Sequence, residues 1–174
     1  SRSFGQLLTE FAPLEEAVAA YATRAAEKLR RQGLVAGSVG VFVQTNPFRA
    51  DLPQYQGVRH FPLEPTADTR LLAQAALRLL RDLYRPGYAY QKAGVILTEL
   101  IPEALRQPTL FEDDTALARS QALMAAVDKI NQTFGSGTVK LLAEGNDPRR
   151  AMRAERRTPR YTTQLEELAV AKAG

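Results

Sequence analysis

The 174-residue sequence predicts an α+β fold: a β-α-β-β-α-β domain, then a linker, then a small helical or mixed C-terminal region. Two segments carry apolar residues at helical spacing, four shorter ones read as strands, and the chain beyond them is more polar and basic. We expect the domain over 1–104, the linker over 105–113 and the C-terminal region over 114–174. This element order places both helices on one face of a four-stranded sheet.

The first half of the domain reads as strand, helix, strand. Residues 1–9 favour a strand, and Pro13 suits the first turn of the helix that follows. Gly33 supplies a left-handed cap at the end of that helix. Beyond it, three valines alternate with smaller or less apolar residues, which is typical of a half-buried strand. The helix stripe and the valines are Leu14, Val18, Ala22, Ala25, Leu29, Val39, Val41 and Val43.

The second half repeats the pattern as strand, helix, strand. A short strand is expected over 57–63 and a longer one over 88–101. Between them, Thr66 or Asp68 can cap a helix that Pro86-Gly87 ends. Its apolar stripe is Leu72, Ala76, Leu79 and Leu83. With both helices on one face, the other sheet face stays uncovered, and we expect function there.

The C-terminal region begins with a helix over 114–134 and a short strand over 138–143. The helix carries one apolar stripe, Leu123, Val127, Ile130 and Phe134. A chain of about 60 residues buries only ~60% of its surface, too little for a secure core of its own. We therefore expect it to dock on the first domain, to dimerise, or to become ordered with a partner.

Composition excludes several classes of function. The absence of Cys excludes disulfides and thiolate catalysis, and the single His60 excludes a multi-histidine metal site. No apolar run is long enough to span a membrane. The acidic pairs Glu15/Glu16 and Asp113/Asp114 suit helix starts, and no catalytic or metal-binding constellation is visible. The net charge of +4, in which arginine predominates, favours a phosphate-bearing partner.

The linker carries an apolar pair that it cannot bury by its own folding. Gln107 precedes Leu110 and Phe111, a layout similar to the peptide that bacterial polymerases and repair proteins insert into the sliding clamp. The alternative is that the pair docks on this chain. Pro108 stands where such peptides commonly carry Leu, and proline favours an extended backbone there.

Several motifs in the same order resemble the UmuC family, the catalytic subunits of DNA polymerase V and its plasmid-borne relatives among the Y-family translesion polymerases. The resemblance spans nearly the whole chain, although the Trp that often precedes the basic tail is missing. The motifs are Ser1–Gly5, Tyr21–Arg30, Thr45–Phe48, Tyr90–Val95, Gln107–Phe111, Leu123–Asn131, Phe134-Gly135 and Pro159–Thr163.

The resemblance implies that 1–104 is the little-finger domain, which grips the backbone of both DNA strands without reading sequence. It implies an error-prone polymerase of the SOS response in the bacterial cytoplasm, at the nucleoid. The Mg-binding carboxylates would lie upstream, so we expect no catalysis and no cofactor in this chain. Polar side chains and close-approach glycines on the uncovered face are the expected DNA contacts: Arg2, Ser3, Gly5, Tyr90, Lys92 and Gly94.

The basic tail has a net charge of +5 over 149–160. It is a solvated charge run, a DNA contact, or a site for the cleaved UmuD-type subunit or the recombinase filament, which the family supports. The candidate partner-binding residues are Arg156, Arg157, Arg160 and Tyr161. A rival interpretation is an RNA-binding or protein-binding module of the same fold without a polymerase role. An RNA module needs aromatic residues on its central strands, and these strands offer little beyond Phe42.

Overall fold

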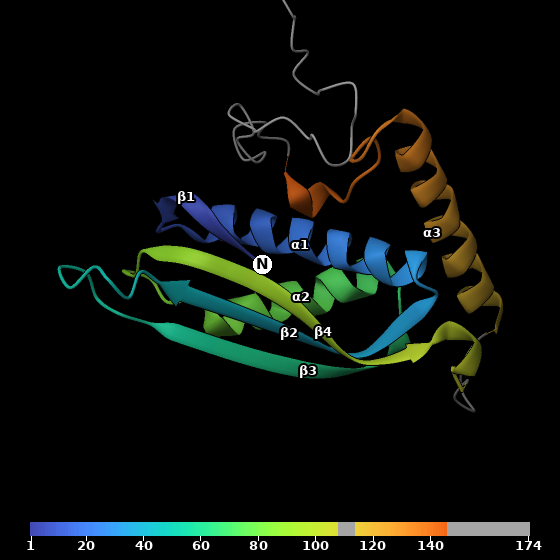
Figure 1. Cartoon of the computed structure of the whole chain (residues 1–174), viewed down its shortest axis with the longest axis horizontal. Helices are drawn as coiled ribbons and strands as arrows, with labels where there is room; N and C mark the ends of the chain where they lie inside the picture. The colour runs from blue at the N-terminus through green and yellow to red at the C-terminus, as the bar shows by residue number, and fades with distance from the viewer. Residues whose placement is uncertain (108–113, 146–174) are drawn as a thin grey trace, which may run out of the picture.

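The computed structural model describes residues 1–107 and 114–145. Four antiparallel strands form one sheet in the order β1-β4-β2-β3, with three α-helices (Figure 1). The α+β fold class is confirmed. In chain order the elements are β1 (Arg2–Leu8), α1 (Phe11–Arg31), β2 (Leu34–Thr45), β3 (Gln56–Thr66), α2 (Thr69–Leu83), β4 (Tyr90–Pro102), the short 3-10 helix η1 (Glu103–Leu105), α3 (Asp114–Phe134) and the 3-10 helix η2 (Leu142–Glu144).

The two β-α-β units interlock. β4 lies between β1 and β2, and β2 lies between β3 and β4, so each helix connects two strands that are separated by one strand of the other unit. α1 packs on β4 and β2, α2 packs on β2 and β3, and the two helices pack on each other (Figure 1). One face of the sheet is therefore covered and the other faces outward.

Local sequence accounts for the helix boundaries. The last turn of α1 carries three basic residues, and Gly33 lies just beyond the helix at φ +65°, a left-handed conformation that glycine adopts at little cost. The Asp68 side chain caps α2 by accepting a hydrogen bond from the Arg70 backbone N–H at 2.7 Å. The predicted stop of α2 before Pro86-Gly87 is confirmed, since the helix ends at Leu83.

The core lies between the helix pair and the sheet. Leu14 and Val18 of α1 and Leu80 of α2 are fully buried against the three alternating valines of β2. Tyr90 is also fully buried, and its hydroxyl donates to the Arg85 carbonyl and accepts from the Arg85 N–H, at 3.0 and 2.8 Å. Burial raises the pKa of the Tyr90 hydroxyl.

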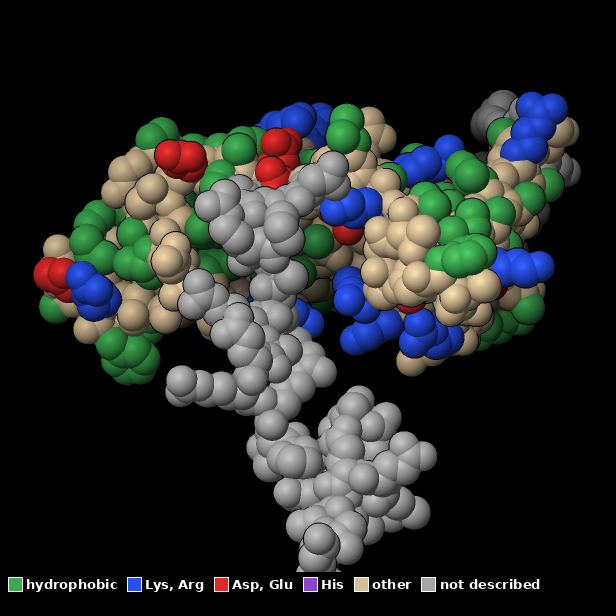
Figure 2. Space-filling view, turned by 90° about the horizontal axis from the view of Figure 1, so that it is seen from above, with side chains coloured by type: hydrophobic (Ala, Val, Ile, Leu, Met, Phe, Trp, Pro, Cys, Tyr) green, Lys and Arg blue, Asp and Glu red, His purple; other side chains and the backbone are tan. Residues whose placement is uncertain are grey.

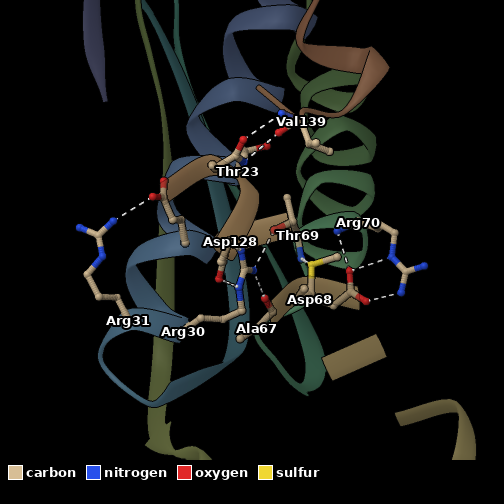
Figure 3. Close-up of polar contacts among 12 residues, drawn as sticks. Thr23, Arg30, Arg31, Ala67, Asp68, Thr69, Arg70, Asp128 and Val139 are labelled. Carbon is tan, nitrogen blue, oxygen red and sulfur yellow. Dashed lines mark hydrogen bonds and ion pairs between the residues drawn. The ribbon is translucent and has the colours of Figure 1, made fainter. Parts of the chain in front are cut away.

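A polar seam attaches α3 to α1 and α2 (Figure 3). The Arg30 guanidinium donates two hydrogen bonds of 2.7 Å to the Asp128 carboxylate, and it also bonds the Ala67 carbonyl and the Thr69 hydroxyl. Met124 is the one apolar side chain of α3 that is buried, and its sulfur accepts a weak bond from the Thr69 N–H. Docking on the first domain, one of the three outcomes expected from the sequence, is the one observed for 114–145.

Two details of the C-terminal prediction are wrong. Residues 138–143 form a bend, an irregular stretch and the start of η2 rather than a strand, and the Asn131 amide bonds both the N–H and the carbonyl of Val139, the groups that a neighbouring strand would pair. The predicted stripe of α3 also points largely outward: Leu123, Ile130 and Phe134 are exposed. The helix docks instead through Met124 and Asp128.

Candidate nucleic-acid interface

The strand register defines the outward sheet face. Paired residues of antiparallel neighbours share a face, and the valines of β2 point into the core, so the residues between them point outward. We call the resulting set the bare face. It comprises Ser38, Gly40, Phe42 and Gln44 of β2, Gln56, Val58, His60 and Pro62 of β3, and Lys92, Gly94, Ile96 and Thr98 of β4, with Ser3 of β1 opposite Lys92.

The one Lys or Arg side chain of the bare face, Lys92, lies at the corner where β4 meets the beginning of β1, and Arg2 and Lys28 lie near it on the other side. The Lys92 ammonium lies 5.8 Å from the centre of the Phe42 ring. Arg2, Lys92 and Lys28 all lie close enough to act electrostatically on the backbone nitrogen of Ser1. These three cationic side chains therefore surround the beginning of β1, where an approaching anion would be attracted.

Basic side chains are not confined to that corner. Figure 2 looks onto the molecule from the top of Figure 1 and shows Lys and Arg side chains gathered around the end that carries α3. At the other borders of the molecule, Arg81 is paired with Glu15 and Arg49 with Asp51. The charge of the chain is thus distributed over several surfaces.

Gly5 of β1 and Gly94 of β4 differ in how closely a ligand could approach their backbone. Nothing lies within 4 Å of the position that a Cβ of Gly5 would take, so the backbone of β1 is open to a close approach there. At Gly94 the same position lies 2.4 Å from Cε1 of Phe42 and 2.5 Å from Cβ of Ser1. The structure therefore opens the backbone at Gly5 and covers it at Gly94.

The six residues predicted to contact DNA do not all lie together. Ser3, Gly5 and Lys92 are neighbours across β1 and β4, and Gly94 lies beneath Phe42. Tyr90 is in the core, because the register of β4 against β2 shifts between Gln44 and Thr45 and turns Tyr90 to the helix side. Arg2 pairs with Ala93, a core residue, and so belongs to the covered side near the sheet edge.

Sequence reasoning missed several polar members of the bare face, above all Gln44, Gln56 and Thr98. The signal was present, since Ser38, Gly40 and Phe42 alternate with the core valines, and continuing that alternation reaches Gln44. The residues of β3 and β4 opposite them follow only once the register is known.

The remaining predicted residues lie at or beyond the limits of the described structure. Gln107 is exposed and lies two residues beyond η1. Leu110 and Phe111 of the predicted clamp peptide lie outside the described residues, as do Arg156, Arg157, Arg160 and Tyr161 of the tail.

Two cavities lie away from the bare face, and the described ranges contain no group of side chains that could bind a metal ion. Two cavities, of about 150 and 580 Å³, lie along the two sides of α3, and neither is lined by the bare face. Across residues 1–107 and 114–145 no three His, Cys, Asp or Glu side chains are placed to hold a metal ion. In the same ranges no helix is long and apolar enough to cross a membrane.

Comparison with known proteins identifies the family. The C-terminal domain model of the impB/mucB/samB family matches residues 1–110, and a domain of unknown function matches 121–171. The chain is 38% identical to protein UmuC of Salmonella typhimurium over 97% of its length and 39% identical to protein ImpB of the same organism over all of it. It is 34% identical to DNA polymerase IV of Desulfatibacillum aliphaticivorans over 67% of its length.

The chain spans about two fifths of the length of the UmuC and ImpB proteins that it matches (40% and 41%), and 28% of the polymerase IV. These matches confirm the resemblance that the sequence motifs indicated. Its fold, the matching family model and the similarity of nearly its whole length to UmuC and ImpB show that the chain belongs to the impB/mucB/samB family.

Proposed function

We propose that this chain is the DNA-gripping and partner-docking portion of an error-prone translesion DNA polymerase that acts in SOS damage tolerance. Residues 1–104 hold the DNA backbone through the bare face, 105–113 tether the protein to the sliding clamp, and 114–174 bind accessory proteins. The polymerising centre, with its Mg-binding carboxylates, belongs to a part of the protein outside this chain. The protein acts in the bacterial cytoplasm, at the nucleoid.

The observation that carries the DNA-binding role is the corner formed by β1 and β4 on the uncovered sheet. Ser3 pairs with Lys92, Gly5 leaves the backbone open, and Arg2 and Lys28 add positive charge beside them. Hydroxyl, ammonium and backbone N–H donors are the groups that contact phosphate without reading bases. A polymerase that moves along damaged templates needs contacts of this sequence-independent kind.

The partners of the linker and tail follow from family membership and residue type. Gln107 is exposed and available to a partner, and Leu110 with Phe111 would fill an apolar pocket of the clamp. The tail residues Arg156, Arg157, Arg160 and Tyr161 would contact the cleaved UmuD-type subunit or the recombinase filament.

The bare face argues for DNA over RNA. On the central strands β2 and β4 its one aromatic side chain is Phe42, which is half-buried beneath Lys92. RNA-recognition modules of this fold stack two or three bases on aromatic residues of the sheet. This face provides a platform for one base at most. A protein-binding module without DNA affinity remains the second candidate, and the experiment below distinguishes the two.

The test is a titration of a blunt DNA duplex with the full chain, followed by fluorescence anisotropy at several salt concentrations. Binding should be independent of sequence and weaken as salt rises, with a slope of log K against log salt of about −0.9 for each phosphate contacted. The variant Lys92→Gln should reduce the slope by about one contact, whereas Lys129→Gln on exposed α3 should not. Binding that is insensitive to salt, or equal losses in both variants, would contradict the proposal.

A further inference from the structure

A group of arginines on the helix-covered side of β3 has no part in the proposed grip on duplex DNA. The register pairs Arg59 with Val41, a core residue, so Arg59 lies on the same side of the sheet as the helices. Arg78 of α2 lies over the ring of Phe61 in β3, and Arg85, just beyond α2, lies over the ring of Tyr55 next to that strand. We call Arg59, Arg78 and Arg85 the basic edge.

Aromatic rings hold two of these side chains in place. The Arg85 guanidinium carbon lies 4.7 Å from the centre of the Tyr55 ring, and that of Arg78 lies 5.8 Å from the centre of the Phe61 ring. Tyr55 is itself fixed, because its hydroxyl donates to the Leu83 carbonyl at 3.0 Å. A guanidinium stacked on a ring keeps its N–H donors directed to the sides and outward.

The basic edge also differs in its partners from the arginines that are bound to carboxylates. Each of these has an ion pair in the described structure: Arg30, Arg31, Arg49, Arg70 and Arg81. Within the described ranges no hydrogen bond or ion pair joins Arg59, Arg78 or Arg85 to a carboxylate, and all three residues are exposed. Asp82, one helical turn beyond Arg78, reduces the local charge without bonding to it.

The spacing and chemistry of the basic edge suit a chain of phosphates. Tyr55, directly before β3, and Phe61, within it, are six residues apart, which corresponds to about 20 Å at ~3.4 Å per residue of extended chain. Arg59 lies between them. The planar guanidinium fork matches phosphate oxygens, and three forks in a row fit a polymer of phosphates better than one isolated ion.

The position of the basic edge favours single-stranded over double-stranded DNA. β3 is an outer strand of the sheet (Figure 1) and is shared by both surfaces, with His60 on the bare face and Arg59 on the other side. A duplex held on the bare face is too stiff to turn around this edge, since DNA has a persistence length of ~50 nm. A single strand that continues from the duplex is flexible enough to do so.

We infer that the basic edge binds the phosphate backbone of single-stranded DNA that continues from the duplex held on the bare face. The inference rests on the proposed function for the origin of that strand. The binding chemistry of the edge itself depends only on the three arginines and the rings beneath them.

The experiment compares a blunt duplex, the same duplex with a single-stranded extension, and an unpaired oligo-dT of similar length. Site sizes of single-strand-binding surfaces suggest an extension of about 12 nucleotides. The variant is Arg59→Gln/Arg78→Gln/Arg85→Gln in the full chain. Its control is Arg24→Gln/Arg119→Gln/Lys129→Gln, which removes the same charge from exposed positions of α1 and α3.

The wild-type chain should bind the extended duplex more tightly than the blunt one, and the variant at the basic edge should lose that difference. Counterion release predicts a loss of roughly fivefold per contact at ~0.1 M salt, with the salt slope reduced by about 2. Affinity for the blunt duplex should not change. The control triple variant should retain the preference for the extension.

Each other outcome has a definite meaning. If the variant keeps the preference for the extension, or if the control loses it equally, the inference is wrong. If poly-glutamate of equal charge competes better than oligo-dT, the edge binds an acidic protein instead and the inference is overturned. If the wild-type chain fails to bind the blunt duplex but binds oligo-dT through the three arginines, the proposed function fails while the chemistry of the basic edge is supported.

Discussion

The ring of Phe42 on β2 lies across Gly94, its register partner on β4. An aromatic side chain over a glycine of the neighbouring strand compensates for the missing side chain and protects the backbone. The Lys92 ammonium lies on the same ring. Side-chain packing therefore covers the backbone at the centre of the bare face. The backbone that a ligand could approach closely lies on the edge strand β1, at Gly5.

Gly94→Ala should destabilise the fold. The new Cβ would meet Phe42 Cε1 at 2.4 Å, and displacing a packed ring costs about 1–3 kcal/mol. Gly5→Ala is the matched control, because nothing lies within 4 Å of its Cβ position. Urea unfolding measures both variants. Equal stabilities of the two would show that Phe42 does not pack on Gly94 in solution.

The sequence was sufficient to predict the four strands and three α-helices found in the described part of the chain, because the helices carry clear apolar stripes and the capping and stop residues are explicit. Asp68, Gly33 and Pro86-Gly87 act as those signals indicate. The prediction of a strand over 138–143 is wrong because of a contact with a side chain outside that segment. The side chain of Asn131 pairs with Val139, and no pattern in the short segment itself indicates that.

The site was less predictable, because a face is set by register as well as by residue type. Tyr90, Lys92 and Gly94 share a face only if β4 alternates without interruption, and the irregularity opposite Gln44 and Thr45 turns Tyr90 inward. The buried side of α3 was likewise chosen by partners distant in the sequence. Arg30 of α1 bonds Asp128 of α3, and the predicted apolar stripe of α3 stays largely exposed.

Asp128→Ala should loosen α3. The Arg30 side chain is only 14% exposed, and losing its carboxylate partner would leave a mostly buried charge with unmade hydrogen bonds. Such a loss costs about 1–3 kcal/mol, so amide exchange in α3 should accelerate. Glu27→Ala breaks the exposed pair with Arg31 and should change stability by less than ~1 kcal/mol. Similar exchange rates in both variants would contradict the assigned role of the seam.

Asp68 should make the fold sensitive to acid. Burial alone would raise the pKa of its carboxyl, but hydrogen bonds from the Arg70 side chain, Ser120 and the Arg70 backbone lower it below the usual value of 3.8. A lowered folded-state pKa means that the stabilisation is complete above the unfolded-state pKa and is lost as pH falls through the folded-state pKa.

Melting temperatures measured from neutral pH downward should therefore fall below about pH 4, and Asp68→Asn should flatten this decline. Asn keeps the ability to cap the helix but carries no charge. Asp82→Asn, on the exposed side of α2, serves as the control and should follow the wild type. A decline of the same steepness in Asp68→Asn would remove Asp68 as its cause.

The linker should anchor the protein to the sliding clamp. Leu110→Ala/Phe111→Ala removes two anchors whose truncation typically costs ~2 kcal/mol or more each, so clamp affinity should fall at least roughly tenfold. Gln107→Ala should give a smaller loss in the same direction. Phe48→Ala/Leu71→Ala removes an exposed Phe and an exposed Leu outside the linker and should leave the affinity unchanged. An unaltered titration for the linker variant would mean that its apolar pair docks within this chain.

The most direct test of the DNA-binding surface is the response of backbone amide NMR signals to a blunt duplex. The grip proposed here predicts the largest shifts along β1 and β4, at Ser3, Gly5 and Lys92, with smaller ones at Thr98 on the bare face. The outer surfaces of α1 and α2 should change little. Shifts concentrated on those helices, with β1 and β4 unaffected, would show that DNA binds the opposite side of the domain.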